Sequence, residues 1–105
     1  TAVNYNKQVI WIILNDSGFG MIYHGRKMIS IPDAFASRFQ RVDFVKMAEA
    51  LGAQGVKVTK PGEINKKMID GIIATGKPTV IDVDINPEEV PPIQSRIASL
   101  EDSYV

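Results

Sequence analysis

VIWIILNDSGFGM, residues 9–21, is the stretch that decides the fold of this chain. Residues 9–14 are apolar without interruption and rich in β-branched and aromatic side chains. Such a run predicts a parallel strand that is covered on both faces. The run stops at residues 15–18, Asn-Asp-Ser-Gly, which are all turn formers. We therefore expect a buried strand that leads into a glycine-containing loop.

A helix and a second strand are predicted after this loop. Asp43 can cap the helix, whose apolar stripe at i, i+3, i+4 and i+7 runs from Phe44 to Leu51. Gly52 suits the left-handed position at the end of the helix. Residues 55–58 then form a short strand. Before this helix, residues 19–28 are expected to be a loop or a short helix, and residues 30–41 a turn with a short helical piece.

A further helix and a third strand complete the pattern. Thr59 is a candidate cap, Pro61 fits the first turn, and Gly76 ends the helix. Residues 79–85 form the strand. One face of the predicted helix is made by Ile64, Met68 and Ile72.

The order strand, helix, strand, helix, strand predicts an α/β fold with a parallel sheet between helical layers, a three-layer α/β/α arrangement. Residues 1–90 form the domain, and residues 91–105 a tail that is extended at first and ends in a short helix near Ile97 and Leu100. A sheet this narrow has two apolar faces and an apolar edge, which 105 residues can hardly cover.

The composition limits the classes of partner. The 12 basic and 12 acidic residues balance, so no electrostatic attraction to nucleic acid or to an anionic membrane is expected. No apolar run reaches the roughly 18 residues of a membrane span. The absence of cysteine excludes disulfides and thiolate metal sites and agrees with a cytoplasmic protein. The start at Thr1, shortly before a buried strand, is interpreted as a cut inside a larger protein.

The loop after the first strand is the best candidate for a ligand site, because ligands of open parallel sheets bind beyond the carboxyl ends of the strands. Asp16 offers a hard oxygen, and Gly18 and Gly20 let the backbone turn sharply, so that a carbonyl can face inward. A carboxylate and a carbonyl, completed by phosphate oxygens and water, are typical Mg²⁺ ligands. By residue type alone, an ordinary turn is the commoner interpretation.

Four segments give the loop a context: LNDSGFGMI, VDFVKMAEALGA, GVKV and PTVIDV, at residues 14–22, 42–53, 55–58 and 78–83. In this order and spacing they resemble the C-terminal region of the acetolactate synthase family of thiamine diphosphate (ThDP)-dependent enzymes. The resemblance implies that the chain is the C-terminal part of a ThDP-binding fold.

The resemblance also implies a metal site. In that family a Gly-Asp-Gly motif, the second of two Asn residues and a backbone carbonyl hold Mg²⁺ on the cofactor's diphosphate. By position, these last two ligands correspond to Asp16 and the carbonyl of Gly18, whereas Asn15 need not touch the metal. Asp in place of Asn departs from the commonest pattern, although catabolic acetolactate synthases look similar here. The printed sequence contains no Gly-Asp-Gly.

Further residues near the loop take expected roles from the same resemblance. Gly20, Met21 and Ile22 are expected close to the cofactor; the alternative is that Met21 and Ile22 belong to the core, which we favour for Ile22. His24 can donate a proton, but a partly exposed structural role is preferred. Gly25 stands where biosynthetic acetolactate synthases usually have Trp, which argues against an enzyme of branched-chain amino acid synthesis.

The expected function is that of a fragment of a ThDP- and Mg²⁺-dependent 2-keto-acid decarboxylase or carboligase, a lyase or transferase that acts as a homo-oligomer on a 2-keto acid. No catalytic residue is assigned, since no glutamate lies in a matching context and Asp82 and Asp84 are interpreted as a strand signature. The isolated chain is expected to be inactive. The alternatives are a related ThDP enzyme of the pyruvate oxidase or sulfopyruvate decarboxylase type, a proteolytic product of the whole enzyme, and a non-catalytic α/β module.

Overall fold

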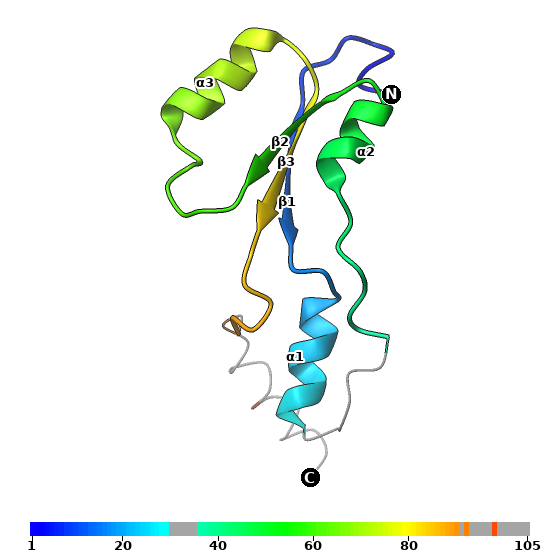
Figure 1. Cartoon of the computed structure of the whole chain (residues 1–105), viewed down its shortest axis with the longest axis vertical. Coiled ribbons are helices and arrows are strands. Elements are labelled where there is room, and N and C mark those ends of the chain that lie inside the picture. The colour runs from blue at the N-terminus through cyan, green and yellow to red at the C-terminus, as the bar shows by residue number, and fades with distance from the viewer. Residues whose placement is uncertain (30–35, 91, 93–97, 99–105) are drawn as a thin grey trace.

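Three parallel strands form a single sheet in the computed structural model, which describes residues 1–29, 36–90, 92 and 98 (Figure 1). The third strand lies between the other two, in the order β1-β3-β2, and both pairs are parallel. The predicted parallel α/β sheet is therefore confirmed. The strands are β1 (Ile10–Asn15), β2 (Gln54–Val58) and β3 (Thr79–Asp84).

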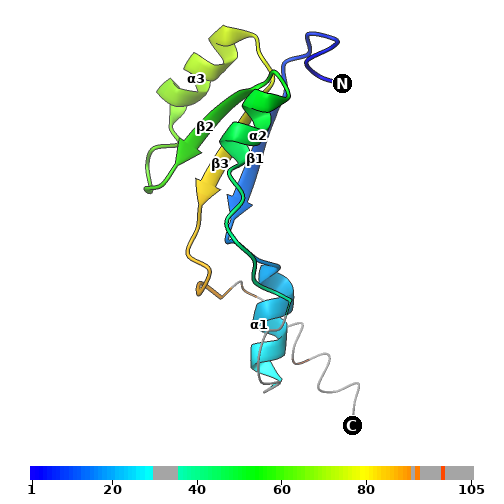
Figure 2. The same cartoon turned by 45° about the vertical axis from the view of Figure 1, so that its right-hand side comes forward.

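Helices cover both faces of this sheet. Figures 1 and 2 show α2 and α3 on opposite sides of the strands, which gives the predicted three layers. Another helix, α1, lies beyond the carboxyl ends of the strands and lengthens the molecule to 54 × 27 × 26 Å. The helices are α1 (Gly20–Met28), α2 (Phe44–Ala50) and α3 (Lys66–Thr75).

The core lies between β3 and α3. Ile81, on the central strand, is completely buried and packs with Val58 and Ile72. On the other face of the sheet, Ala48 of α2 is also completely buried. Partly buried apolar residues surround the first cluster, namely Ile10, Val56, Met68, Ile69 and Val83.

The predicted ends of α2 are confirmed. The Asp43 carboxylate accepts a hydrogen bond of 3.0 Å from the amide of Lys46, as an N-cap residue should. Gly52 has φ of 81°, the left-handed conformation that favours glycine. Gly76 ends α3 in the same conformation, with φ of 65°.

The predicted start of α3 is wrong. Pro61 lies in a turn that follows Thr59, and the helix begins only after Asn65, whose side chain accepts from the amide of Met68 at 3.0 Å. Gly62 has φ of 85°, which is incompatible with a helix that starts at Pro61. The amide side chain of Asn65 thus provides the cap that Thr59 was expected to provide.

Apolar side chains of β1, one of the two edge strands, remain exposed within the described part of the chain. On the edge strand β1, the exposed fractions of Trp11, Ile12 and Leu14 are 45%, 52% and 65%. This agrees with the expectation that 105 residues cannot cover a narrow apolar sheet. Across the described ranges, no helix combines the length and the apolar character needed to cross a membrane. The turn predicted at Pro32 and the helix predicted near Ile97 lie outside the described residues.

Candidate functional site

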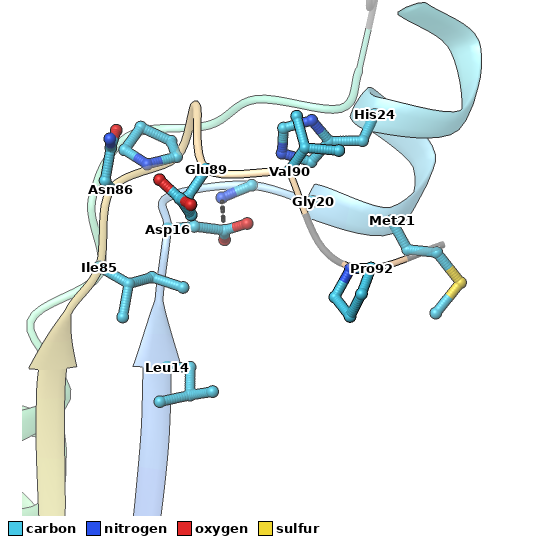
Figure 3. A pocket seen from close by; sticks show the side chains of 12 residues that line it. Leu14, Asp16, Gly20, Met21, His24, Ile85, Asn86, Glu89, Val90 and Pro92 are labelled. Atoms are coloured by element: carbon cyan, nitrogen blue, oxygen red, sulfur yellow. Dashed lines mark hydrogen bonds between the residues drawn. The ribbon is translucent and has the colours of Figure 1, made fainter. Parts of the chain in front are cut away.

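A pocket lies at the carboxyl end of the sheet, between the loop after β1, the start of α1 and the segment that follows β3 (Figure 3). This is the edge where ligands of parallel sheets bind. Its polar side chains are those of Asp16, His24, Asn86 and Glu89. Its apolar walls are made by Leu14, Met21, Ile85, Pro87, Val90 and Pro92, and the backbone of Gly18 and Gly20 completes the lining.

The Asp16 carboxylate is held by the loop that it begins. Its Oδ1 accepts from the amide of Gly18 at 3.0 Å, the dashed line in Figure 3. Its Oδ2 lies where a side chain at position 20 would have to stand, because a Cβ added to Gly20 would come within 2.4 Å of it. A carboxylate fixed in this way can present one oxygen to a ligand without first losing conformational freedom.

Gly18 is required by the segment that crosses the loop. It forms an isolated antiparallel bridge with Arg38, and an added Cβ would lie only 2.6 Å from the Ser37 carbonyl oxygen. The bridge consists of a 2.8 Å bond from the Phe19 amide to the Ser37 carbonyl and a 3.1 Å bond from the residue after Arg38 to the Ser17 carbonyl. These bonds do not use the Gly18 carbonyl, which was predicted to face the metal.

The structure brings together four of the five residues predicted to contact the cofactor. Asp16, Gly18, Gly20 and Met21 all line the pocket, and the Met21 side chain is 69% exposed. Ile22 is not among the lining residues and is 53% exposed, so the interpretation of Ile22 as a core residue is wrong.

His24 was the least expected member of the pocket. It was predicted to be partly exposed, but only 4% of its surface is accessible and it faces the pocket. The reason is that residues 20–28 form a helix, in which positions 20 and 24 lie on the same face. Its ring meets that of Tyr23 edge-on, with centroids 5.1 Å apart. Glu89 was also not predicted to line the pocket, because it is far from the loop in the sequence and only the fold brings the two together.

Arg38 connects the segments that surround the pocket. Its guanidinium group donates to the backbone carbonyl of Asp16 at 3.2 Å and to that of Pro87 at 3.3 Å. It also pairs with the Glu88 carboxylate at 3.0 Å and lies 3.9 Å from the centre of the Tyr23 ring. One side chain thus links the loop after β1, α1 and the segment after β3.

Glu88 is the acidic partner in this cluster. Partial desolvation raises the pKa of its carboxyl, but hydrogen bonds from Tyr23 and Lys27 and the charges of Lys27 and Arg38 together outweigh this effect. The net result is a pKa below the ordinary value for glutamate. The pairs are solvent-exposed, so their contribution to stability is modest.

Asp82 belongs to a structural network rather than to the pocket. Its buried carboxylate pairs with Lys57 at 3.2 Å and with Arg41 at 3.4 Å, and it accepts from the Asn15 side chain at 3.0 Å. Asp84 pairs with the same Arg41. Buried charged groups are normally paired in this way, in agreement with the interpretation of Asp82 as part of a strand signature.

The residues of the pocket fit part of a divalent-cation site. The fixed Asp16 carboxylate supplies a hard oxygen, and the Gly18 carbonyl is the second candidate ligand. Within the described part of the chain, no three Asp, Glu or His side chains gather around one point. Further ligands would therefore come from phosphate, water or another segment.

The sequence of this chain is similar to those of several other proteins over most of its length. It is 34% identical over 97 residues to YdaP of Bacillus subtilis, a protein named for thiamine pyrophosphate, with 92% of this chain and 16% of the relative covered. It is 35% identical over 104 residues to the acetolactate synthase large subunit of Buchnera aphidicola, and this match covers 90% of this chain and 17% of the relative. It is 28% identical over 109 residues to the acetolactate synthase isozyme 3 large subunit of Escherichia coli, and this match covers 100% of this chain and 19% of the relative.

The chain thus spans less than a fifth of the length of each of these relatives. Residues 1–83 match the family described as "Thiamine pyrophosphate enzyme, C-terminal TPP binding domain". Among the described elements, the matched range contains β1, β2, α1, α2, α3, the loop from Asp16 to Gly20, and β3 except for its last residue, Asp84. The chain belongs to the thiamine pyrophosphate enzyme family and corresponds to part of its C-terminal TPP-binding domain.

Proposed function

We propose that this chain supplies part of the Mg²⁺-diphosphate site of a 2-keto-acid decarboxylase or carboligase of the acetolactate synthase type. Asp16 binds the metal through its carboxylate and Gly18 through its carbonyl oxygen. Gly20 and Met21 adjoin the cofactor; Ile22, the next residue of α1, was also expected there but does not line this pocket. The whole enzyme, a lyase or transferase, would act on a 2-keto acid as a cytoplasmic homo-oligomer.

One observation supports this proposal above the others: the loop holds the Asp16 carboxylate at the rim of the pocket and leaves no room for a side chain at position 20. The bond from the Gly18 amide is an Asx turn, which ordinary loops also contain. The close approach of Oδ2 to Gly20 is the feature that such a turn does not need. A magnesium ion prefers carboxylate and carbonyl oxygens together with phosphate oxygens. The geometry therefore agrees with a metal that bridges the protein and a diphosphate.

The residues of this chain bind and orient, and the reactive group is the cofactor's. When bound, ThDP supplies the chemistry that cleaves and transfers 2-keto acids. The apolar walls around Leu14, Met21 and Val90 would exclude water from the ligand. The pocket contains no residue to which we assign proton transfer, so we expect the isolated chain to be inactive.

The experiment uses Mn²⁺, which replaces Mg²⁺ and broadens nearby nuclear magnetic resonances. The ¹⁵N-labelled chain is titrated with Mn²⁺ in the presence of inorganic pyrophosphate. We expect selective broadening of the amide signals of Gly18 and Gly20, because both amides adjoin the proposed metal. Asp16→Ala should abolish this broadening.

Asp70→Ala is the matched control. Asp70 is an exposed carboxylate of α3 that pairs with Lys66, far along the chain from the loop. Its loss changes the net charge by the same amount as Asp16→Ala, and the broadening at Gly18 and Gly20 should persist. Equal broadening in the wild type and in Asp16→Ala would refute the proposal.

The cofactor itself should bind the isolated chain only weakly, since this chain supplies only two of the expected metal ligands. In calorimetry with ThDP and Mg²⁺ we expect no saturable heat at micromolar concentrations. Tight binding would show that the diphosphate site is complete within this chain, which contradicts the proposed division of ligands.

A related ThDP enzyme with another substrate is the second candidate, and Gly25 favours it. Gly25 lies on α1, where an added Cβ would meet no atom within 4 Å. Packing therefore does not require glycine at this position, and the Trp that biosynthetic acetolactate synthases usually have there is absent although the position is open. Enzymes of the pyruvate oxidase or sulfopyruvate decarboxylase type therefore remain in the proposal as alternatives to a branched-chain biosynthetic enzyme.

A further inference from the structure

We propose that His24 is a ligand-binding residue of this pocket, whose imidazole hydrogen-bonds an anionic oxygen of the bound ligand. The oxygen belongs to a phosphate or to the carboxylate of a 2-keto acid. This inference rests on the proposed function, because it adds a contact to the same pocket.

Burial of the imidazole is the first observation. His24 is 96% buried, as only 4% of its surface is accessible, and the pocket is the surface that it lines. Within the described residues its one recorded side-chain partner is the Tyr23 ring, and no completely buried polar side-chain atom lacks a hydrogen-bond partner. The ring nitrogens are therefore accessible from the pocket and available to a ligand. Figure 3 shows the ring pointing from α1 toward the segment that holds Glu89 and Val90.

The position of His24 on α1 favours an anion as the partner. The helix begins at Gly20, and its first turn contains no acidic residue and no side-chain cap. The free amides at a helix N-terminus attract negative charge. His24 lies one turn further along the same face, beyond Gly20, beside which the Asp16 carboxylate stands.

The carboxylates of the pocket set a condition on this binding. Asp16 and Glu89 both line it, and they repel an anion that enters alone. A divalent cation held by Asp16 removes this repulsion. Binding of the anion next to His24 should consequently depend on Mg²⁺, whereas Mg²⁺ alone should leave the imidazole unchanged.

The test uses the fact that His24 is the only histidine of the chain. A chain labelled with ¹⁵N in histidine gives the ring signals of this one residue. We would add Mg²⁺ alone, then inorganic pyrophosphate with Mg²⁺, and in a separate sample pyruvate with Mg²⁺. A shift of the ring nitrogen signals with one anion identifies the source of the oxygen: pyrophosphate for the cofactor, pyruvate for the substrate.

Three results would overturn the inference. The ring signals do not move with either anion, or they move with Mg²⁺ alone, or they move as strongly in Asp16→Ala. The amide signals of Gly18 and Gly20 in the same samples separate this failure from that of the proposed function. If these amides respond and the ring does not, the metal site stands and the role of His24 is wrong; if nothing responds, both are wrong.

Two substitutions distinguish ligand binding from packing. His24→Phe keeps a ring but removes the nitrogens, and His24→Gln keeps a hydrogen-bond donor. Followed at the Gly20 amide, the affinity for the responding anion should fall about tenfold in His24→Phe and less than about threefold in His24→Gln. Equal affinity in His24→Phe and the wild type would refute the inference. The label experiment decides the case if either variant fails to fold.

Discussion

Two regions of the molecule differ in what they bury: the face of the sheet beneath α3, and the region around α1 beyond the carboxyl ends of the strands (Figure 1). Beneath α3 the buried groups are apolar, with Ile81, Ile72 and Val58 packed together. At the carboxyl end, around α1, the buried groups are polar, such as Asn15 and His24, whereas Leu14 and Met21 are exposed. A domain normally buries apolar and exposes polar side chains, so the described residues alone do not complete the region around α1, in agreement with the ligand site that we propose there.

The largest expected effect concerns the apolar core beneath α3. Ile81→Ala removes a completely buried side chain from the centre of the core and should lower the free energy of unfolding by about 3 kcal/mol. Ile73→Ala on α3 is the control, because Ile73 is 51% exposed, and should cost less than about 1 kcal/mol. Urea denaturation measures both, and equal losses would contradict the assignment of the core.

The next effect concerns the site. Gly20→Ala places a Cβ against the Asp16 carboxylate, which must turn away, so we expect the Mn²⁺-dependent broadening at Gly18 to be lost at a cost in stability of at most about 1 kcal/mol. If the variant keeps the broadening, the close approach of Asp16 to position 20 has no functional role. The comparison with Gly25→Ala controls for the change of residue type on the same helix.

Gly25→Ala should have the opposite sign. The position lies inside α1 and has free space, so alanine should raise the free energy of unfolding by about 0.5–1 kcal/mol. Gly71→Ala in α3 has the same surroundings and should behave alike. Thermal unfolding distinguishes these outcomes, and destabilisation by either change would contradict the helical backbone assigned there.

The smallest effect separates two helix caps by pH. The hydrogen bond from the Lys46 amide lowers the pKa of the Asp43 carboxyl despite opposing desolvation. Its stabilising contribution is therefore complete above the pKa of the unfolded chain and disappears as the pH falls through the lower pKa of the folded state.

Asn65 does not titrate and provides the control. Asn65→Ala should cost about 1 kcal/mol at every pH, whereas Asp43→Ala should cost stability near neutrality and progressively less in acid. Unfolding curves recorded from about pH 6 to about pH 2.5 test this difference. A cost of Asp43→Ala that does not change with pH would contradict the cap.

Local signals predicted most of the fold. The apolar run before Asn15 predicted β1, and Asp43 and Gly52 predicted both ends of α2, because caps depend on neighbouring residues only. The start of α3 was wrong because Thr59 and Asn65 are both good caps, and only the backbone at Gly62 decides between them.

The site was predictable only in part, for the same reason. Asp16, Gly18 and Gly20 lie at alternate positions of one short segment, so their pattern can be recognised in the sequence. The membership of His24 required knowing that α1 is a helix, and residues 19–28 contain no strong cap to indicate it. The position of Glu89 in the pocket depends on contacts between distant parts of the chain. Arg38 donates to the carbonyl of Asp16 in the loop and to the carbonyl of Pro87, which lies 49 positions after Arg38.

The central claim is that the loop after β1 binds a divalent cation through Asp16. Its most direct test is a crystal of the chain soaked in Mn²⁺ and inorganic pyrophosphate, with the metal located by anomalous scattering. We predict a peak about 2.2 Å from an Asp16 carboxylate oxygen, with the Gly18 carbonyl as a second ligand. A peak at another carboxylate, with Asp16 turned to bulk solvent, would contradict the account.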